Sequence, residues 1–161
     1  MVRLFTIRQH LPVALGILLL ATTAGCGGAE GEADQAVAGT ADAQGAVFTG
    51  SLKVSATTVA MGSTITVTET ATNLTASQVG PIIVGIRRLG FDVVSAQKPR
   101  TGICRIAGSA TCNFLELAPQ ETQSYTLVLR PIAPGTYPIQ GWTTSSYVAG
   151  GFSGTVTVTV Q

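Results

Sequence analysis

The sequence predicts an all-β protein whose body is a two-layer sandwich of short antiparallel strands. Apolar and polar residues alternate with a period of two along much of residues 47–161, as they do when successive side chains point to opposite faces of a strand. The β-branched residues Val, Ile and Thr dominate these segments, and they favour strands. Turn signals containing Gly or Pro recur between them at roughly 8–12-residue intervals, which is typical of a sandwich or barrel.

The expected strands follow from the alternating segments in order. The first places Phe48, Leu52 and Val54 on one face, and the second, residues 64–71, places hydroxyl side chains on one face. Further alternating or β-branched segments cover residues 82–86, 91–94, 125–129 and 155–160. No part of the domain has a helical period. About seven to nine strands in a chain of this length is the size of an immunoglobulin-like sandwich.

Glu69 conflicts with this pattern because it has the same parity as Ile65 and Val67. An unpaired carboxylate is costly to bury. We therefore expect either that the strand has left the core by Glu69 or that a β-bulge shifts its phase.

Residues 1–25 have the features of a targeting segment. Arg3 and Arg8 precede an uncharged apolar stretch, residues 13–24, which is too short to span about 30 Å of hydrocarbon comfortably. Its length and flanks are typical of a signal peptide. Cleavage would also remove His10, the only histidine, which would exclude Ser-His-Asp triads and His-ligated metal sites from the mature chain.

The segment ends in Thr23-Ala24-Gly25-Cys26, which resembles the lipobox of bacterial lipoproteins with Thr23 in place of the usual Leu. The resemblance implies cleavage before Cys26 and acylation of its sulfur, a modification that palmitate labelling would detect. It places the protein in the bacterial cell envelope, anchored to the membrane through Cys26. In a Gram-negative source the outer membrane is the default, because Gly27 rather than Asp follows the cysteine. A plain secretory signal or an uncleaved anchor is the alternative.

Residues 26–46 predict a flexible acidic tether rich in Gly and Ala. Its only charged side chains are Glu30, Glu32, Asp34 and Asp42, and it contains too little apolar surface to order itself. A flexible chain of this length typically spans about 25 Å. A short Ala-rich helix is the alternative. The globular domain is then expected over residues 47–161.

Two segments of this domain have a distinctive pattern, residues 68–73 (TETATN) and residues 110–119 (ATCNFLELAP). They resemble the DUF11-type Ig-like repeat domains of bacterial envelope proteins. The chain departs from the family pattern at Glu116, where a small residue is common, and at Gln120, where Gly is usual. The resemblance covers about residues 52–160 and implies a structural or surface role rather than one reaction.

Cys104 and Cys112 flank the natural turn Ala107-Gly108-Ser109. Two strands of a hairpin would bring them within disulfide distance, and an oxidising envelope would preserve the bond. We expect a structural disulfide. A redox or metal dithiol is the alternative, but redox pairs usually have the spacing C-x-x-C, and a metal site normally needs four ligands.

Two features are candidates for ligand binding. The domain contains a basic cluster that only Asp92 opposes locally, and it consists of Arg87, Arg88, Lys98, Arg100 and Arg105. Such a cluster would attract an anionic polymer or lipid headgroups, unless its residues are merely solvated. Trp142 is the only tryptophan. In a regular strand it faces away from the core and could stack on a sugar, whereas a bulge at Gly141 would turn it inward.

These observations favour a non-catalytic protein without cofactor or metal. The carboxylates Glu69, Asp92, Glu116 and Glu121 are scattered along the sequence, and the net charge is only +1, so nucleic acid is not an expected partner. We expect a lipid-anchored envelope protein whose Ig-like domain is a structural or interaction module, with an envelope protein or polymer as its partner. The alternative is a carbohydrate- or polyanion-binding module.

Overall fold

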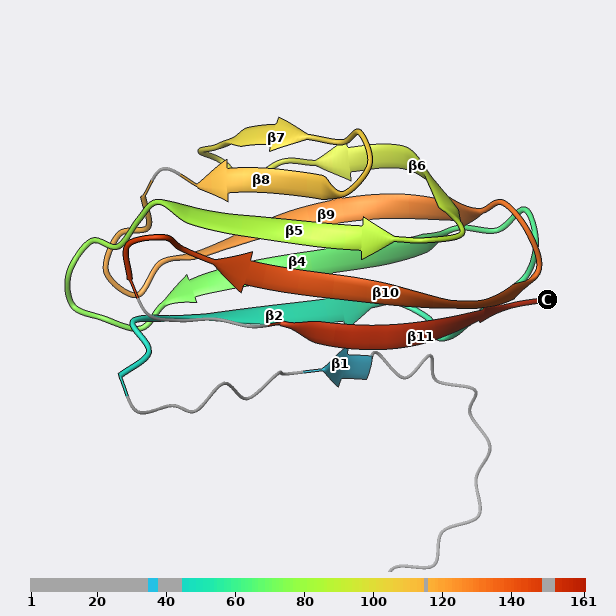
Figure 1. Ribbon diagram of the computed structural model, residues 1–161, viewed down its shortest axis with the longest axis horizontal. Helices are drawn as coiled ribbons and strands as arrows, with labels where there is room; N and C mark the ends of the chain where they lie inside the picture. Colours follow the sequence, from blue (N-terminus) through green and yellow to red (C-terminus); the bar gives the residue numbers. More distant parts are fainter. Residues whose placement is uncertain (1–34, 38–44, 115, 149–152) are drawn as a thin grey trace, which may run out of the picture. The chain divides into compact units, whose positions relative to one another are not determined.

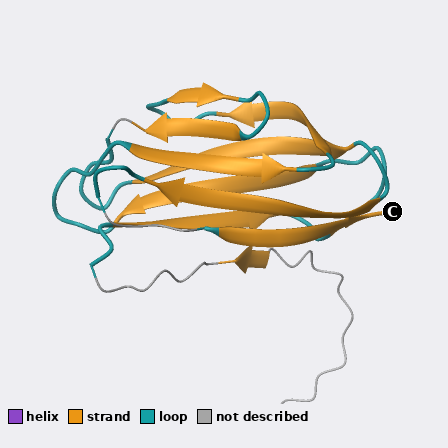
Figure 2. Ribbon diagram, viewed as in Figure 1, coloured by secondary structure: helices purple, strands orange, loops and turns teal. Residues whose placement is uncertain are grey.

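The computed structural model describes residues 35–37, 45–114, 116–148 and 153–161. The expected signal peptide (1–25), Cys26 and most of the expected tether lie outside these residues. Within the described part, every regular element is a β-strand, and the strands form two sheets (Figures 1 and 2). The predicted all-β sandwich is confirmed.

The five-stranded sheet is wholly antiparallel and has the order β1 (Gln35–Val37), β2 (Phe48–Val54), β4 (Ile65–Asn73), β9 (Thr122–Pro131) and β6 (Phe91–Gln97). The six-stranded sheet has the order β3 (Thr58–Val59), β11 (Gly154–Val160), β10 (Gly135–Thr144), β5 (Ile82–Arg88), β8 (Ala110–Phe114) and β7 (Ile103–Arg105). Its strands are antiparallel except for the parallel pair β3–β11.

The short strands β1, β3 and β7 correct the sequence-based expectation of seven to nine antiparallel strands. β3 pairs in parallel with the Thr-Val repeat of β11, where Thr159 N donates to Thr57 O at 2.8 Å. β1 lies within the range assigned to the flexible tether and pairs with β2. The backbone groups of an edge strand are free to pair with another segment, which accounts for both additions.

The core lies between the sheets and consists of the alternating apolar residues of both. Phe48, Leu52, Ile65, Leu127 and Ile139 are all fully buried within it. The opposite face of the five-stranded sheet is rich in hydroxyls, which bond in pairs across β4 and β9: Thr68–Thr126 at 3.1 Å, Thr70–Ser124 at 3.3 Å and Thr72–Thr122 at 2.9 Å. Alternation therefore determines which side chains are buried and which remain available to solvent.

Asn73, the last residue of β4, ties two loops together. Its buried side chain donates to the carbonyls of Ser77, Leu117 and Ala118 at 2.8, 3.1 and 2.8 Å. Its Oδ1 accepts from the backbone and hydroxyl of Thr75, both at 2.9 Å. The loop after β4 is thereby fixed to the segment that precedes β9.

The expected disulfide between Cys104 and Cys112 is present. The two residues lie directly opposite each other on β7 and β8, with Cα atoms 4.1 Å apart. Cys112 is buried and Cys104 is partly buried. The bond therefore holds the short edge strand β7 to the rest of its sheet.

Removing this bond should destabilise the domain. The double variant Cys104→Ala/Cys112→Ala should lose about 2–3 kcal/mol of unfolding free energy, because the unfolded chain regains the entropy of a small closed loop. Urea denaturation of the two proteins measures the loss. In parallel, reductant should raise the intact mass of the wild-type chain by two hydrogen atoms, and an unchanged mass would disprove the bond.

Candidate functional site

The predicted basic cluster does not form one patch. Arg87 and Arg105 are exposed and lie on the outer face of the six-stranded sheet, as their register partners Gln140 and Thr111 indicate. Arg88 has the opposite parity and turns inward, whereas Arg100 lies near the five-stranded sheet. Alternation places the neighbours Arg87 and Arg88 on opposite faces of the sheet, so the five predicted basic residues do not form one cluster.

Trp142 lies on the same outer face as Arg87 and Arg105. The pairing of β10 with β5 and β11 is regular through Gly141, so no bulge turns the indole inward. Gly85 is its direct cross-strand partner. A Cβ atom on Gly85 would lie 2.1 Å from Cζ2 of the indole, which means that the ring lies against the bare backbone of β5.

The register places polar side chains around this indole. The row that contains Trp142 and Gly85 continues through Thr111 to Arg105, and the neighbouring row contains Gln140 and Arg87. We call Trp142, Arg87, Arg105, Thr111 and Gln140 the tryptophan face. A partly exposed ring with guanidinium, amide and hydroxyl groups around it can stack on a sugar ring and bind its hydroxyls or anionic substituents.

Arg88 has a structural role instead. Its guanidinium donates to Phe91 O at 2.7 Å and to Ile106 O at 3.2 Å, and so bridges the two sheets. Its Nε is buried without a hydrogen-bond partner, as is the hydroxyl of Tyr125. Burial raises the pKa of Tyr125, and the positive charge of Arg88 partly opposes that effect. Arg88 is therefore no longer a ligand-binding candidate.

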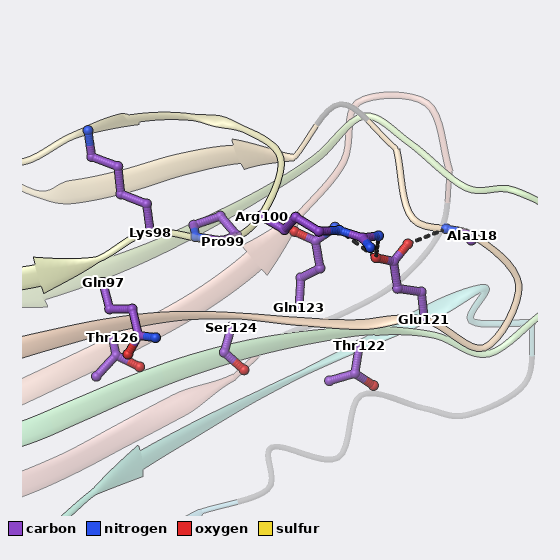
Figure 3. Close-up of a pocket in the computed structure, with 10 residues that line it drawn as sticks. All are labelled: Gln97, Lys98, Pro99, Arg100, Ala118, Glu121, Thr122, Gln123, Ser124 and Thr126. Atoms are coloured by element: carbon purple, nitrogen blue, oxygen red, sulfur yellow. Dashed lines mark hydrogen bonds and ion pairs between the residues drawn. The ribbon is translucent and has the colours of Figure 1, made fainter.

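Arg100 lines an open pocket of about 660 Å³ beside β9 (Figure 3). One side is the segment that follows β6, with Lys98 and Arg100, and the floor includes Thr122, Ser124 and Thr126 of β9. The exposed Arg100 guanidinium donates to Glu121 Oε1 at 2.9 Å. The pairing with Glu121 leaves Arg100 less able to bind an external anion.

Glu121 is held by several donors in this pocket. Ala118 N donates to its Oε2 at 2.7 Å, and Gln123 Nε2 donates to its Oε1 at 3.0 Å. These bonds, together with the charge of Arg100, lower the pKa of Glu121, and the Ala118 bond has the largest effect. Glu121 is thus a stable carboxylate that braces the loop rather than a candidate acid.

Glu69 is fully buried between the sheets, so both expectations for it are wrong: the strand has not left the core, and β4 pairs regularly on both sides. Thr143 Oγ1 donates to Glu69 Oε1 at 2.8 Å, and the Ser153 hydroxyl donates to the same oxygen. Glu69 Oε2 has no partner. A Cβ atom on Gly141 would lie 2.1 Å from that oxygen, so the glycine provides the space for the carboxyl group.

Burial raises the pKa of Glu69 to about 7, although the bonds from Ser153 and Thr143 lower it in part. The group is therefore largely protonated in mildly acidic solution, which reduces the cost of burying it. Its parity with Ile65 and Val67 was the signal for burial in the sequence. The partners that make burial tolerable lie more than 70 residues away.

The described residues contain no group of three or more His, Cys, Asp or Glu side chains that could hold a metal ion. In the same part of the chain, no helix is long and apolar enough to cross a membrane.

Comparison with known proteins shows the fold. No family model and no curated protein matches the chain. The crystal structure of a complex between a CaDoc0917 variant and CaCohA2 at pH 5.5 contains a similar chain, with 14% identity and a TM-score of 0.50, over 71% of this chain and 99% of that one. At such low identity the likeness shows the β-sandwich fold alone.

Two further structures are more distant. The cupredoxin domain of amoB from Nitrosocaldus yellowstonii has 13% identity and a TM-score of 0.38, over 61% of this chain and 56% of that one. The Pseudomonas fluorescens alkylpurine DNA glycosylase AlkC, bound to DNA containing an abasic site analog, has 13% identity and a TM-score of 0.43, over 73% of this chain and 31% of that one.

The buried carboxyl group makes stability depend on pH. Between pH 4.5 and about 7 the unfolded chain loses the Glu69 proton while the native state retains it. The free energy of unfolding should therefore fall by about 3 kcal/mol across this window as pH rises. Glu69→Gln, which cannot ionise, should remove most of this decline in urea titrations at each pH.

The exposed carboxylate Glu116 provides the control for this experiment. Glu116→Gln should retain the wild-type decline. If Glu69→Gln shows the same decline as the wild-type protein, another group is responsible.

Proposed function

We propose that this chain is a lipid-anchored protein of the bacterial cell envelope whose β-sandwich is a non-catalytic interaction module. The lipobox-like residues 23–26 carry this proposal. The Cys104–Cys112 disulfide supports it, because such bonds persist in oxidising compartments such as the envelope. In this proposal Cys26 holds the protein at the membrane, and the sandwich presents its outer faces and ends to an envelope partner.

The positions of the carboxylates favour binding over catalysis. Glu69 is enclosed in the core, and Glu121 is paired with Arg100. Asp92 lies opposite Arg130 on the exposed face of the β6–β9 pair, and Glu116 is exposed beyond β8. These four groups occupy different environments, whereas general acid–base chemistry requires groups placed around one substrate.

A second candidate function is recognition of a carbohydrate or polyanion by the tryptophan face. The observation that favours it is the indole of Trp142 lying against Gly85, in register with Arg105 and beside Arg87. A stacked sugar would contact the ring, and the guanidinium groups would bind carboxylate, phosphate or sulfate substituents. An acidic envelope polysaccharide has this chemistry.

Lipidation can be tested directly in cells that express the full chain. Radiolabelled palmitate should be incorporated into the wild-type protein, and Cys26→Ala should abolish the label because its side chain has no sulfur to acylate. Cys104→Ala, which keeps Cys26, should remain labelled. Absence of label in the wild-type protein would refute the anchor.

Binding by the tryptophan face can be tested on an array of neutral and acidic glycans. Trp142→Ala should weaken binding of any acidic glycan retained by the wild-type protein about tenfold, because the stacking surface is lost. Leu74→Ala removes an exposed apolar side chain that follows β4 of the five-stranded sheet and should bind as the wild type does. Equal binding by Trp142→Ala and the wild type would show that the tryptophan face is not the binding surface.

A further inference from the structure

One end of the sandwich exposes a large apolar side chain on each of four turns. The turns follow β3, β5, β7 and β9 and lie at the end where the chain terminates (Figure 1). We call their exposed residues the apolar tips: Met61 (44% exposed), Leu89 (55%), Ile106 (36%) and Ile132 (58%). Exposed apolar side chains that gather at one place commonly mark an interaction site.

Hydrogen bonds between these turns fix their arrangement. Ile132 N donates to Gly90 O at 3.1 Å, which joins the turn after β9 to the turn after β5. Arg88 donates to Ile106 O at 3.2 Å and so joins the turn after β5 to the turn after β7. Met61 N donates to Gln161 O at 2.8 Å, which places the fourth turn beside the C-terminus. These hydrogen bonds therefore hold the apolar tips at one end of the folded domain.

Positive charge surrounds these tips. Arg105 directly precedes Ile106, Arg130 lies two residues before Ile132, and Arg87 lies two residues before Leu89. All three arginines are exposed. An acidic side chain, Asp92, also lies at this end, as the second residue of β6 and opposite Arg130. The end thus combines apolar tips with an excess of positive charge.

We propose that the apolar tips dock the domain on the surface of a bilayer that contains anionic phospholipids. Apolar side chains on separate turns can enter between headgroups, while the flanking arginines remain at the level of the phosphates and pair with them. Charge complementarity selects an anionic membrane over a neutral one. The surface shares Arg87 and Arg105 with the tryptophan face but does not include Trp142, and the proposal does not require Cys26 to be acylated.

The direction of β1 agrees with this orientation. Gln35, the first residue of β1, pairs with Val54 at the end of β2 that leads towards the turn carrying Met61. The N-terminal end of β1 is therefore the end nearer the tips. Cys26 precedes Gln35 by nine residues, a length that extends over at most about 30 Å. Only this argument from the position of Cys26 depends on the proposed lipid anchor.

The test asks which end of the sandwich touches the bilayer. Two variants of the full chain are made with Trp142→Phe, so that each has one tryptophan: Leu89→Trp at a tip, and Leu74→Trp as the control. Leu74 is similarly exposed, at 48%, and follows the last residue of β4 at the opposite end of the sandwich. Tryptophan emission is compared on vesicles with plain and with brominated acyl chains, made from phosphatidylglycerol or phosphatidylcholine.

On phosphatidylglycerol vesicles, bromine should quench the Leu89→Trp emission about twofold and leave Leu74→Trp nearly unchanged, because only the tip reaches the acyl boundary. Quenching of Leu89→Trp should be weaker on phosphatidylcholine and in high salt. Replacing Arg105 and Arg130 by Ser should weaken it similarly.

Three results would overturn the proposal. They are equal quenching of both variants, no quenching of Leu89→Trp, and a blue shift of Leu89→Trp that depends on protein concentration without vesicles. The last result would assign the tips to a second copy of the chain. Palmitate labelling is a separate measurement, so an unlabelled protein whose Leu89→Trp emission is quenched would refute the anchor and leave the docking surface intact.

Discussion

The structure depends on the burial of two apolar sheet faces against each other. Each long strand must direct the same parity inward, and the fully buried residues Phe48, Leu52, Ile65, Leu127 and Ile139 do so from both sheets. Burial of apolar surface is the main favourable contribution to folding. The same alternation sends every second residue outward, so the hydroxyls of β4 and β9 and the tryptophan face are consequences of the core pattern.

Glu69 shows how this core accommodates an ionisable group. Its carboxyl group receives hydroxyl donors from Thr143 and Ser153, and Gly141 leaves space for it. Such a group is tolerated because it is hydrogen-bonded and can be neutral. The hydrogen bond from Thr143 to Glu69 joins β10 of one sheet to β4 of the other. At this point in the core, a hydrogen bond takes the place of an apolar contact.

The ends of the strands and the faces of the sheets present different side chains to a partner. The disulfide holds β7 in place, and β7 in turn positions Arg105 on the tryptophan face and leads to Ile106 at the apolar tips. Arg88 is partly buried and joins two of the same turns. Structural bonds inside the sandwich thus determine the two surfaces that we propose for ligand and membrane binding.

The sequence by itself determined the period of two, the turn positions and the pairing of Cys104 with Cys112, because each depends on residues close together in the chain. It could not assign Arg100 to Glu121, since that pairing depends on loop packing. It also misjudged Glu69, whose partners are distant in sequence. Only the tertiary structure brought Met61, Leu89, Ile106 and Ile132 to one end, because antiparallel pairing returns the chain repeatedly to the same edge of the sandwich.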